Sequence, residues 1–218
     1  DLRAALVTEP VANPTPVSPN LFRVISMVLL GGLMLGFMAV YVMDVLDDRF
    51  RSIEEMQWQL RAPVLSIVRE MPPRSGQGLE AVEVAADPDS IASESFRTLR
   101  TALALSDAPT NSVVITSVQP GDGKSTVAAN LAVAFAQAGK RTLLIDGDMR
   151  RAGLSTFLGF KGQQGLSEIL RETAAIEESF VSRVRASLAA NLDLLPCGSR
   201  PANPAELLSS QRLTELLQ

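Results

Sequence analysis

A long apolar stretch runs from Leu21 to Met43 and carries one charged residue, Arg23, near its start. From Val24 onward it holds about 20 residues, and at about 1.5 Å per helical residue these span about 30 Å, the hydrocarbon thickness of a bilayer. A buried core helix or the core of a signal peptide is the alternative, but both are usually shorter. We therefore predict a transmembrane helix over residues 21–43.

The flanks of this stretch predict its surroundings. Residues 1–20 are polar and proline-rich, which disfavours helix, so we expect an extended strap there. The C-terminal side of the apolar run carries more arginines than the N-terminal side. The N-terminal side has Arg3 and Arg23, and the C-terminal side has Arg49, Arg51, Arg61 and Arg69. The positive-inside rule then places the residues after Met43 in the cytoplasm and the strap outside it.

After the apolar run the pattern becomes amphipathic and is then broken. Residues 44–62 have the spacing of an amphipathic helix that ends at Pro63, and residues 64–68 (VLSIV) are typical of a short strand. Prolines and glycines punctuate residues 69–90, which we interpret as a linker. Together these elements form a predicted juxtamembrane helix and linker over residues 44–90.

Residues 91–218 make up the last predicted domain, in which helical and strand periods alternate. A β-branched strand (112–117) leads into a glycine loop, a helix (126–138) and an apolar strand (141–146). This order is a βαβ unit, which predicts an α/β fold with a parallel sheet covered by helices. The other predicted elements are helices over 90–105, 166–171 and 205–217 and a strand over 191–196.

Composition narrows the possibilities further. Hydrophobic residues make up 46% of the 218 residues and charged residues 20%, which excludes a disordered protein. The net charge of −4 gives no reason to expect a nucleic-acid partner. The single cysteine, Cys197, excludes an internal disulfide framework, and the lack of histidine excludes metal sites or triads built on imidazole. Because the chain opens on Asp1 rather than methionine, we expect a fragment.

The glycine loop has the composition of a phosphate-binding loop of the P-loop NTPase type. Glycines at 121 and 123 allow backbone amides to turn toward a phosphate, and the following helix directs its positive end to the same anion. Lys124 can reach the β- and γ-phosphate oxygens, and the Ser125 hydroxyl can reach magnesium. We therefore predict an ATP·Mg²⁺ site. Its nucleotide-binding residues are Pro120, Gly121, Asp122, Gly123, Lys124, Ser125 and Thr126. A plain strand-to-helix turn is the alternative.

Two carboxylates follow the apolar strand that comes after this loop. Asp146 and Asp148 lie beyond Leu143–Ile145, and the carboxyl end of such a strand lies beside the phosphate loop. We expect one carboxylate to hold a magnesium-bound water and the other to help bind the metal or to accept a proton from an incoming hydroxyl. Lys124, Asp146 and Asp148 are thus the predicted catalytic residues. Ser125, Asp146 and Asp148 are the predicted metal-binding residues. An ordinary acidic turn is the alternative.

These motifs resemble those of the bacterial tyrosine kinases that govern capsule and exopolysaccharide export. The run Asp146-x-Asp148-x-Arg150 is similar to that family's second Walker motif. The family's loop has the form Ser-x-x-Pro-x-x-Gly-Lys-Ser/Thr, which fits although Val118 stands where the general Walker pattern has glycine. The loop residues that fit are Ser117, Pro120, Gly123, Lys124 and Ser125. The resemblance implies that Arg150 lies near the nucleotide, steadying phosphate charge or a neighbouring subunit.

Two further segments are similar to the same family. Glu94, Arg97 and Arg100 match its Glu-x-x-Arg-x-x-Arg oligomerisation motif, and their spacing places them on one stripe of a helix. A solvated charged face is the alternative for that stripe. The prolines at 14–20 before a glycine-bearing apolar helix resemble the second membrane segment of polysaccharide chain-length determinants, which many bacteria fuse to the kinase.

The resemblance implies a function for the parent protein. It would autophosphorylate tyrosines in trans within a ring-like homo-oligomer in the bacterial inner membrane, with its kinase domain in the cytoplasm. Cycles of phosphorylation would tune polysaccharide chain length in concert with the polymerase and export machinery. The family's third nucleotide motif and tyrosine-rich tail do not occur, since the only tyrosine is Tyr41, so we expect an incomplete kinase domain.

Two other functions remain open. The first is a membrane-tethered ATPase switch of the partition or division-site type, although those proteins usually carry a lysine early in the loop, where this chain has Gln119. The second is a non-catalytic assembly module in which nucleotide only sets the oligomeric state.

Overall fold

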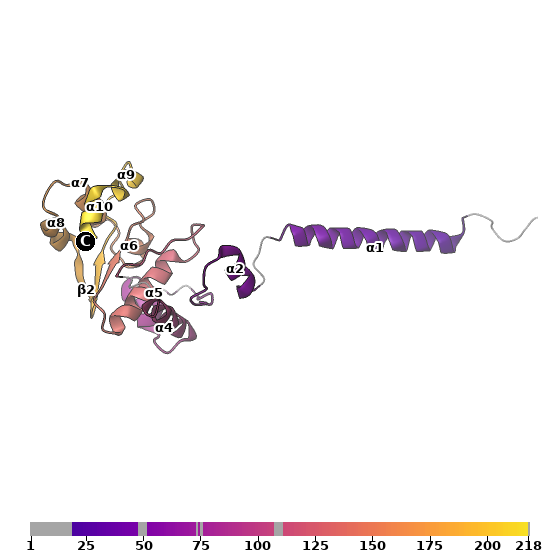
Figure 1. The fold of residues 1–218 in the computed structure, drawn as a ribbon, viewed down its shortest axis with the longest axis horizontal. Helices are drawn as coiled ribbons and strands as arrows, with labels where there is room; N and C mark the ends of the chain where they lie inside the picture. Colours follow the sequence, from indigo (N-terminus) through magenta and orange to yellow (C-terminus); the bar gives the residue numbers. More distant parts are fainter. Residues whose placement is uncertain (1–18, 48–51, 73, 75, 107–110, 218) are drawn as a thin grey trace, which may run out of the picture. The chain divides into compact units, whose positions relative to one another are not determined.

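The structure is a computed structural model that describes residues 19–47, 52–72, 74, 76–106 and 111–217. It divides into two units, Asp1–Ala62 and Pro63–Gln218, which are described separately (Figure 1). All but the last two residues of the predicted strap lie outside the described residues.

The first unit contains one long apolar helix. Helix α1 (Leu21–Val45) has 25 residues, a mean hydropathy of 2.2 and no buried residue within the unit, so it is long and apolar enough to cross a membrane. It extends two residues beyond the predicted end. Helix α2 (Ile53–Leu60) begins where the Ser52 side chain accepts a hydrogen bond from the Glu55 amide (3.1 Å). The continuous helix predicted over 44–62 is therefore wrong in its first part, because α1 takes the first two residues and this cap starts α2 later.

A three-stranded sheet lies in the second unit, with strand order β1-β3-β2. Strand β1 (Thr142–Ile145) pairs in parallel with β3 (Leu192–Leu195), and β2 (Arg185–Ala189) pairs antiparallel with β3. Both parallel strands fall where the sequence predicts them, whereas β2 was not predicted. A tight turn joins β2 to β3, with Asn191 at φ 62°. The fold is thus α/β, and its small sheet is mixed.

Helices cover the sheet and connect its strands. In chain order these helices are α3 (Glu83–Ala86), α4 (Ile91–Ala104), α5 (Lys124–Gln137) and α6 (Gly153–Phe157). They are followed by α7 (Leu166–Arg171), α8 (Ile176–Arg183), α9 (Pro204–Leu208) and α10 (Gln211–Leu216). The single helix predicted over 205–217 is two helices, because Ser210 takes an extended conformation (ψ 150°) and starts α10 anew.

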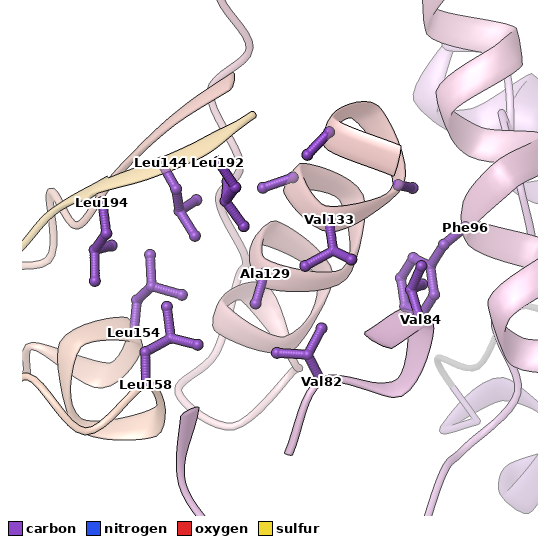
Figure 2. Packing of buried hydrophobic residues seen from close by; sticks show 13 residues of the cluster. Val82, Val84, Phe96, Ala129, Val133, Leu144, Leu154, Leu158, Leu192 and Leu194 are labelled. Atoms are coloured by element: carbon purple, nitrogen blue, oxygen red, sulfur yellow. The ribbon is translucent and has the colours of Figure 1, made fainter. Parts of the chain in front are cut away.

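Helix α5 lies at the centre of the main hydrophobic core. In Figure 2, its Ala129 and Val133 lie between leucines of β1 and β3 on one side and Val84 and Phe96 on the other. A second buried cluster, which contains Leu195, Met149 and Ile169, lies on the opposite face of the sheet from Leu194. Successive residues of a strand point to opposite faces, so the two clusters make both faces of β3 buried. The sheet is accordingly a central layer with helices on each side.

Two predicted strands are not formed. Residues 112–117 and 64–68 form no strand, and the sheet in the described part of the chain contains neither segment. Val114 is 91% exposed, so the β-branched residues before the glycine loop lack the neighbouring strand against which they would be buried. The segment 64–68 is instead held to α4, where the Ser66 hydroxyl donates a hydrogen bond to the Ser95 carbonyl (2.8 Å).

Part of the predicted linker belongs to the core. Residues 78–81 form a 3₁₀ turn and α3 follows. Val82, between them, and Val84, within α3, are both fully buried. The Val84 amide donates to Oδ1 of the buried Asn130 (2.9 Å), and the Val84 carbonyl accepts from the side-chain amide of Gln137 (3.2 Å). Both partners lie on α5, so this segment is bound directly to the helix that follows the glycine loop.

Replacing Asn130 by alanine should lower the free energy of unfolding by about 2 kcal/mol. The change leaves the buried Val84 amide without an acceptor, and an unsatisfied buried donor costs about 1–3 kcal/mol. Chemical denaturation followed by circular dichroism measures the effect. Gln137→Ala removes an exposed side chain that donates to the Val84 carbonyl, and it should cost about 0.5 kcal/mol or less. Equal losses in the two variants would contradict the bridging role of Asn130.

Candidate nucleotide-binding site

The glycine loop has an internally braced conformation. The Gln119 amide donates to Oδ2 of Asp122 (2.8 Å), and the Ser117 hydroxyl donates to the Gln119 carbonyl (2.9 Å). Gly121 and Gly123 have φ of 101° and 90°, in the left-handed region where other residues are strained. The loop is therefore held by its own side chains in a conformation that requires both glycines.

The residues of the loop fit a bound phosphate. A Cβ built on Gly121 or Gly123 would meet nothing within 4 Å, so the space beside these two residues is open. Helix α5, 14 residues long, begins at Lys124 and directs its positive end to the loop. Ser125 and Thr126 follow in the first turn, and the Thr126 carbonyl accepts a hydrogen bond from the Asn130 side chain (2.9 Å). Pro120, which precedes the open turn, is exposed.

Asp146 lies at the end of β1 and is 2% exposed. Its amide extends the parallel ladder by donating to the Leu195 carbonyl (3.0 Å). Its Oδ2 accepts two hydrogen bonds from Ser155, one from the amide (2.7 Å) and one from the hydroxyl (2.6 Å). Its Oδ1 accepts one from the Asp148 amide (3.1 Å). A buried carboxylate with three donors is held as an acceptor in one orientation.

Asp148 has a different environment and is bonded directly to the loop lysine. Its Oδ2 lies 2.8 Å from Nζ of Lys124, and its Oδ1 accepts hydrogen bonds from the amides of Arg150 and Arg151. Burial alone would raise the pKa of the Asp148 carboxyl, but the Lys124 hydrogen bond, the Arg151 amide, the Lys124 charge and the Arg150 amide together outweigh it and lower that pKa. The structure thus brings together two of the predicted catalytic residues, Lys124 and Asp148.

Acid should remove the stability that Asp148 contributes to the nucleotide-free chain. The folded pKa of Asp148 lies below the unfolded value of about 3.9, so its contribution is fully present above that value and is lost as the pH falls through the folded pKa. We expect the difference in unfolding free energy between the unaltered chain and Asp148→Asn to shrink between about pH 5 and pH 2, measured by urea denaturation. Asp89→Asn, at an exposed aspartate, is the control, and a difference independent of pH would contradict the ion pair.

The predicted metal-binding residues fit a magnesium site, which water and phosphate complete, better than they fit a site built only from protein ligands. Within the described residues no three carboxylates, cysteines or histidines cluster as a metal site. Magnesium, however, usually keeps several waters and binds one or two carboxylates together with phosphate oxygens. Ser125 lies beside Gly153 at the start of α6, where an added Cβ would come within 3.0 Å of its Oγ. A hydroxyl, two carboxylates and an open phosphate loop are the donor set that such a site requires.

The remaining predicted residues lie away from these contacts or contribute only their backbone. Among the hydrogen bonds of the described residues, Arg150 enters the site through its amide, and its exposed side chain has no assigned role. On α4, Arg97 pairs with Glu94 (3.2 Å), and Arg100 donates to the Ala134 carbonyl of α5 (3.2 Å). Glu94 and Arg97 therefore lie on an exposed part of α4, whereas Arg100 points toward α5. Their role in oligomerisation stays a prediction.

Two residues of this site were missed by sequence reasoning. Ser155 bonds the carboxylate of Asp146, and Gly153 permits the approach of α6 to Ser125. Neither has a spacing that marks it in the sequence, because both come from a short helix that reaches the site through tertiary packing.

Burial, together with the charges of Asp146, Asp148 and Glu168, raises the pKa of the Cys197 thiol to about 12, which keeps this thiol protonated.

Comparison with known proteins relates the chain to a nucleotide-binding family and to tyrosine-protein kinases. Residues 113–215 match the family described as the CobQ/CobB/MinD/ParA nucleotide binding domain. The chain is similar to the tyrosine-protein kinase YwqD of Bacillus subtilis, with 46% identity over 132 residues, 60% of this chain and 54% of YwqD. It is similar to the tyrosine-protein kinase wzc of Salmonella typhimurium, with 33% identity over 228 residues, 95% of this chain and 31% of wzc. The chain thus spans about half, or less, of these curated relatives.

A solved structure extends the likeness to three dimensions. The BceF tyrosine kinase domain superposes with a TM-score of 0.61 at 34% sequence identity, covering 75% of this chain and 69% of that domain.

Proposed function

Because the chain belongs to the bacterial tyrosine kinase family, we propose that its phosphate loop serves an ATP-dependent protein-tyrosine kinase that phosphorylates its own subunits. The observation that carries the proposal is the juxtaposition of Lys124 with Asp148 beside an open glycine loop, with Asp146 fixed at the adjacent strand end. Phosphoryl transfer requires a cation at the phosphates, a metal-binding carboxylate and a proton acceptor, and these residue types supply all three.

Each residue has a distinct part in the proposed reaction. The loop amides and Lys124 hold the phosphates, and Lys124 exchanges its bond with Asp148 for bonds to the β- and γ-phosphate oxygens. Magnesium, when bound, neutralises charge on those oxygens. Ser125 and Asp146 orient the metal and its waters. Asp148, released from Lys124, either joins the metal or accepts the phenolic proton as the tyrosine oxygen bonds to the γ-phosphorus and the bond to the ADP oxygen breaks.

The setting of the kinase is part of the same proposal. Helix α1 anchors the chain in the bacterial inner membrane, and the second unit lies in the cytoplasm, as the arginine distribution favours. The similarity to wzc extends over 95% of the chain and so includes α1. Subunits associate in a ring through Glu94, Arg97 and Arg100, and the ring acts with the machinery that polymerises and exports polysaccharide. The charged, exposed part of α4 supports a contact between subunits there.

The test is phosphorylation by the full-length protein in lipid nanodiscs, supplied with labelled ATP·Mg²⁺ and a tyrosine-containing acceptor peptide. The peptide supplies an accessible acceptor, because Tyr41, the only tyrosine of these 218 residues, lies within α1. We expect phosphotyrosine with the unaltered protein and its loss with Lys124→Met and with Asp146→Asn. Lys140→Met, at an exposed lysine beyond the far end of α5, should retain activity.

The alternatives give different outcomes in the same experiment. Labelled phosphate released to solvent without phosphotyrosine would contradict the kinase and support the ATPase switch. A change in oligomeric state on nucleotide binding, with neither phosphotyrosine nor hydrolysis, would support the assembly module. Light scattering of the nanodisc sample with and without nucleotide separates these two results.

A further inference from the structure

We propose that Ser155 is a positioning residue for magnesium binding, because it fixes the carboxylate of Asp146 so that Oδ1 is the oxygen presented to the metal-bound water. This inference rests on the proposed function only in assigning Asp146 to magnesium. Ser155 lies nine positions after Asp146, on the short helix α6, and has no part in the phosphate-loop motif.

Three segments converge on the Ser155 hydroxyl. It donates to Oδ2 of Asp146 at the end of β1 (2.6 Å) and accepts from the Cys197 amide just after β3 (3.0 Å). An amide nitrogen can only donate, so the single hydroxyl proton of Ser155 is committed to Asp146. Asp146 and Ser155 are each 2% exposed, so water does not compete for these bonds. The direction of the hydroxyl is therefore set by the fold.

This arrangement makes the two oxygens of Asp146 unequal. Oδ2 receives both the amide and the hydroxyl of Ser155 and has no lone pair left, since each carboxylate oxygen accepts about two hydrogen bonds. Within the described residues, Oδ1 receives only the Asp148 amide and keeps one position free. Rotation of the carboxylate would break the two bonds to Ser155 together. Oδ1 is consequently the oxygen available to a water on magnesium.

The experiment measures magnesium affinity apart from catalysis. The whole chain in detergent micelles is titrated with Mg²⁺ in the presence of a fluorescent ADP analogue, and the affinity for the same analogue is measured in EDTA. Ser155→Ala should raise the half-saturating magnesium concentration about tenfold, as loss of a group that orients a metal-binding residue commonly does. Its affinity for the analogue in EDTA should change less than about twofold, because the phosphate loop is untouched.

Two further variants separate positioning from packing. Ser155→Thr retains the hydroxyl and should stay within about threefold of the unaltered magnesium requirement. Ser93→Ala is the matched control, since Ser93 is equally buried and its hydroxyl donates to the Asp87 carbonyl (2.7 Å), away from the loop. It should destabilise the fold without changing the magnesium requirement. If Ser155→Ala does not fold by circular dichroism, Ser155→Cys, which keeps the volume but donates weakly, replaces it.

An unchanged magnesium requirement in Ser155→Ala (or in Ser155→Cys where it replaces that variant), or the same rise in Ser93→Ala, overturns the proposal. Nucleotide binding by the unaltered chain that does not depend on magnesium also overturns it. Failure of the kinase proposal has a different signature: no phosphotyrosine from the full-length protein, with the magnesium shift of Ser155→Ala still present. That pair of results would keep the positioning role within an ATPase or an assembly module.

Discussion

Replacing Lys124 by methionine should weaken ATP·Mg²⁺ binding about 100-fold. Lys124 is the first residue of α5, directly after the glycine loop, and its Nζ lies 2.8 Å from Oδ2 of Asp148. Hydrogen bonds to charged groups contribute up to about 3 kcal/mol, and each 1.4 kcal/mol is about tenfold in affinity. Isothermal titration calorimetry with a non-hydrolysable ATP analogue measures the loss directly.

The same substitution should leave the fold almost unchanged. The Lys124–Asp148 pair is partly exposed, with 31% and 24% of the two side chains accessible, so its removal should cost about 1 kcal/mol or less. Lys140→Met removes a lysine beyond the other end of α5 and should keep the affinity within about twofold. An unaltered affinity in Lys124→Met would mean that the glycine loop does not bind the phosphates.

Replacing Gly165 by alanine should destabilise the second unit by about 3 kcal/mol. A Cβ at this position would come within 1.9 Å of the Pro196 carbonyl oxygen and 2.6 Å of its carbon, and these backbone atoms cannot turn aside as a flexible side chain can. The close approach is part of the fold, because the next residue, Leu166, donates its amide to that same oxygen (2.8 Å). The backbone conformation does not require glycine, since φ at Gly165 is −165°.

Thermal unfolding followed by circular dichroism checks this expectation, and 3 kcal/mol corresponds to a fall in Tm of about 6–12 °C for a unit of this size. Gly147→Ala is the matched control, because the added Cβ would meet nothing within 4 Å. It should change the free energy of unfolding by about 0.5 kcal/mol or less. A similar, small change in both variants would show that Gly165 does not pack closely on Pro196 in solution.

Local signals account for the parts of the site that the sequence predicted. Glycines at positive φ, the helix that starts at Lys124 and the carboxylates at a strand end are all set within a few residues of one another, so their spacing alone reveals them. The terminal glycine of α5 is a similar case. Gly139 has φ 79°, and the Lys140 amide bonds back to the Phe135 carbonyl (3.1 Å), which is the expected helix-ending pattern.

Long-range contacts account for what the sequence did not predict. Asp146 and Asp148 cannot be told apart by residue type. In the structure Ser155 donates a hydrogen bond to Asp146, whereas Lys124 pairs with Asp148. The strand predicted at 112–117 has strong β propensity but no neighbour to pair with among the described residues, and propensity without a ladder does not make a strand. The glycines and prolines of 69–90 indicated a linker, but Val82 and Val84 are buried by helices that lie later in the chain.

Two hydrogen bonds tie the segment around Val84 to helix α5. Both backbone polar atoms of Val84 are bonded by side chains that lie seven residues apart on α5, about 10 Å along the helix axis. Separating this segment from α5 would break both bonds and expose two buried valines. Since the phosphate loop is continuous with that helix, the segment around Val84 is linked through α5 to the start of the nucleotide site.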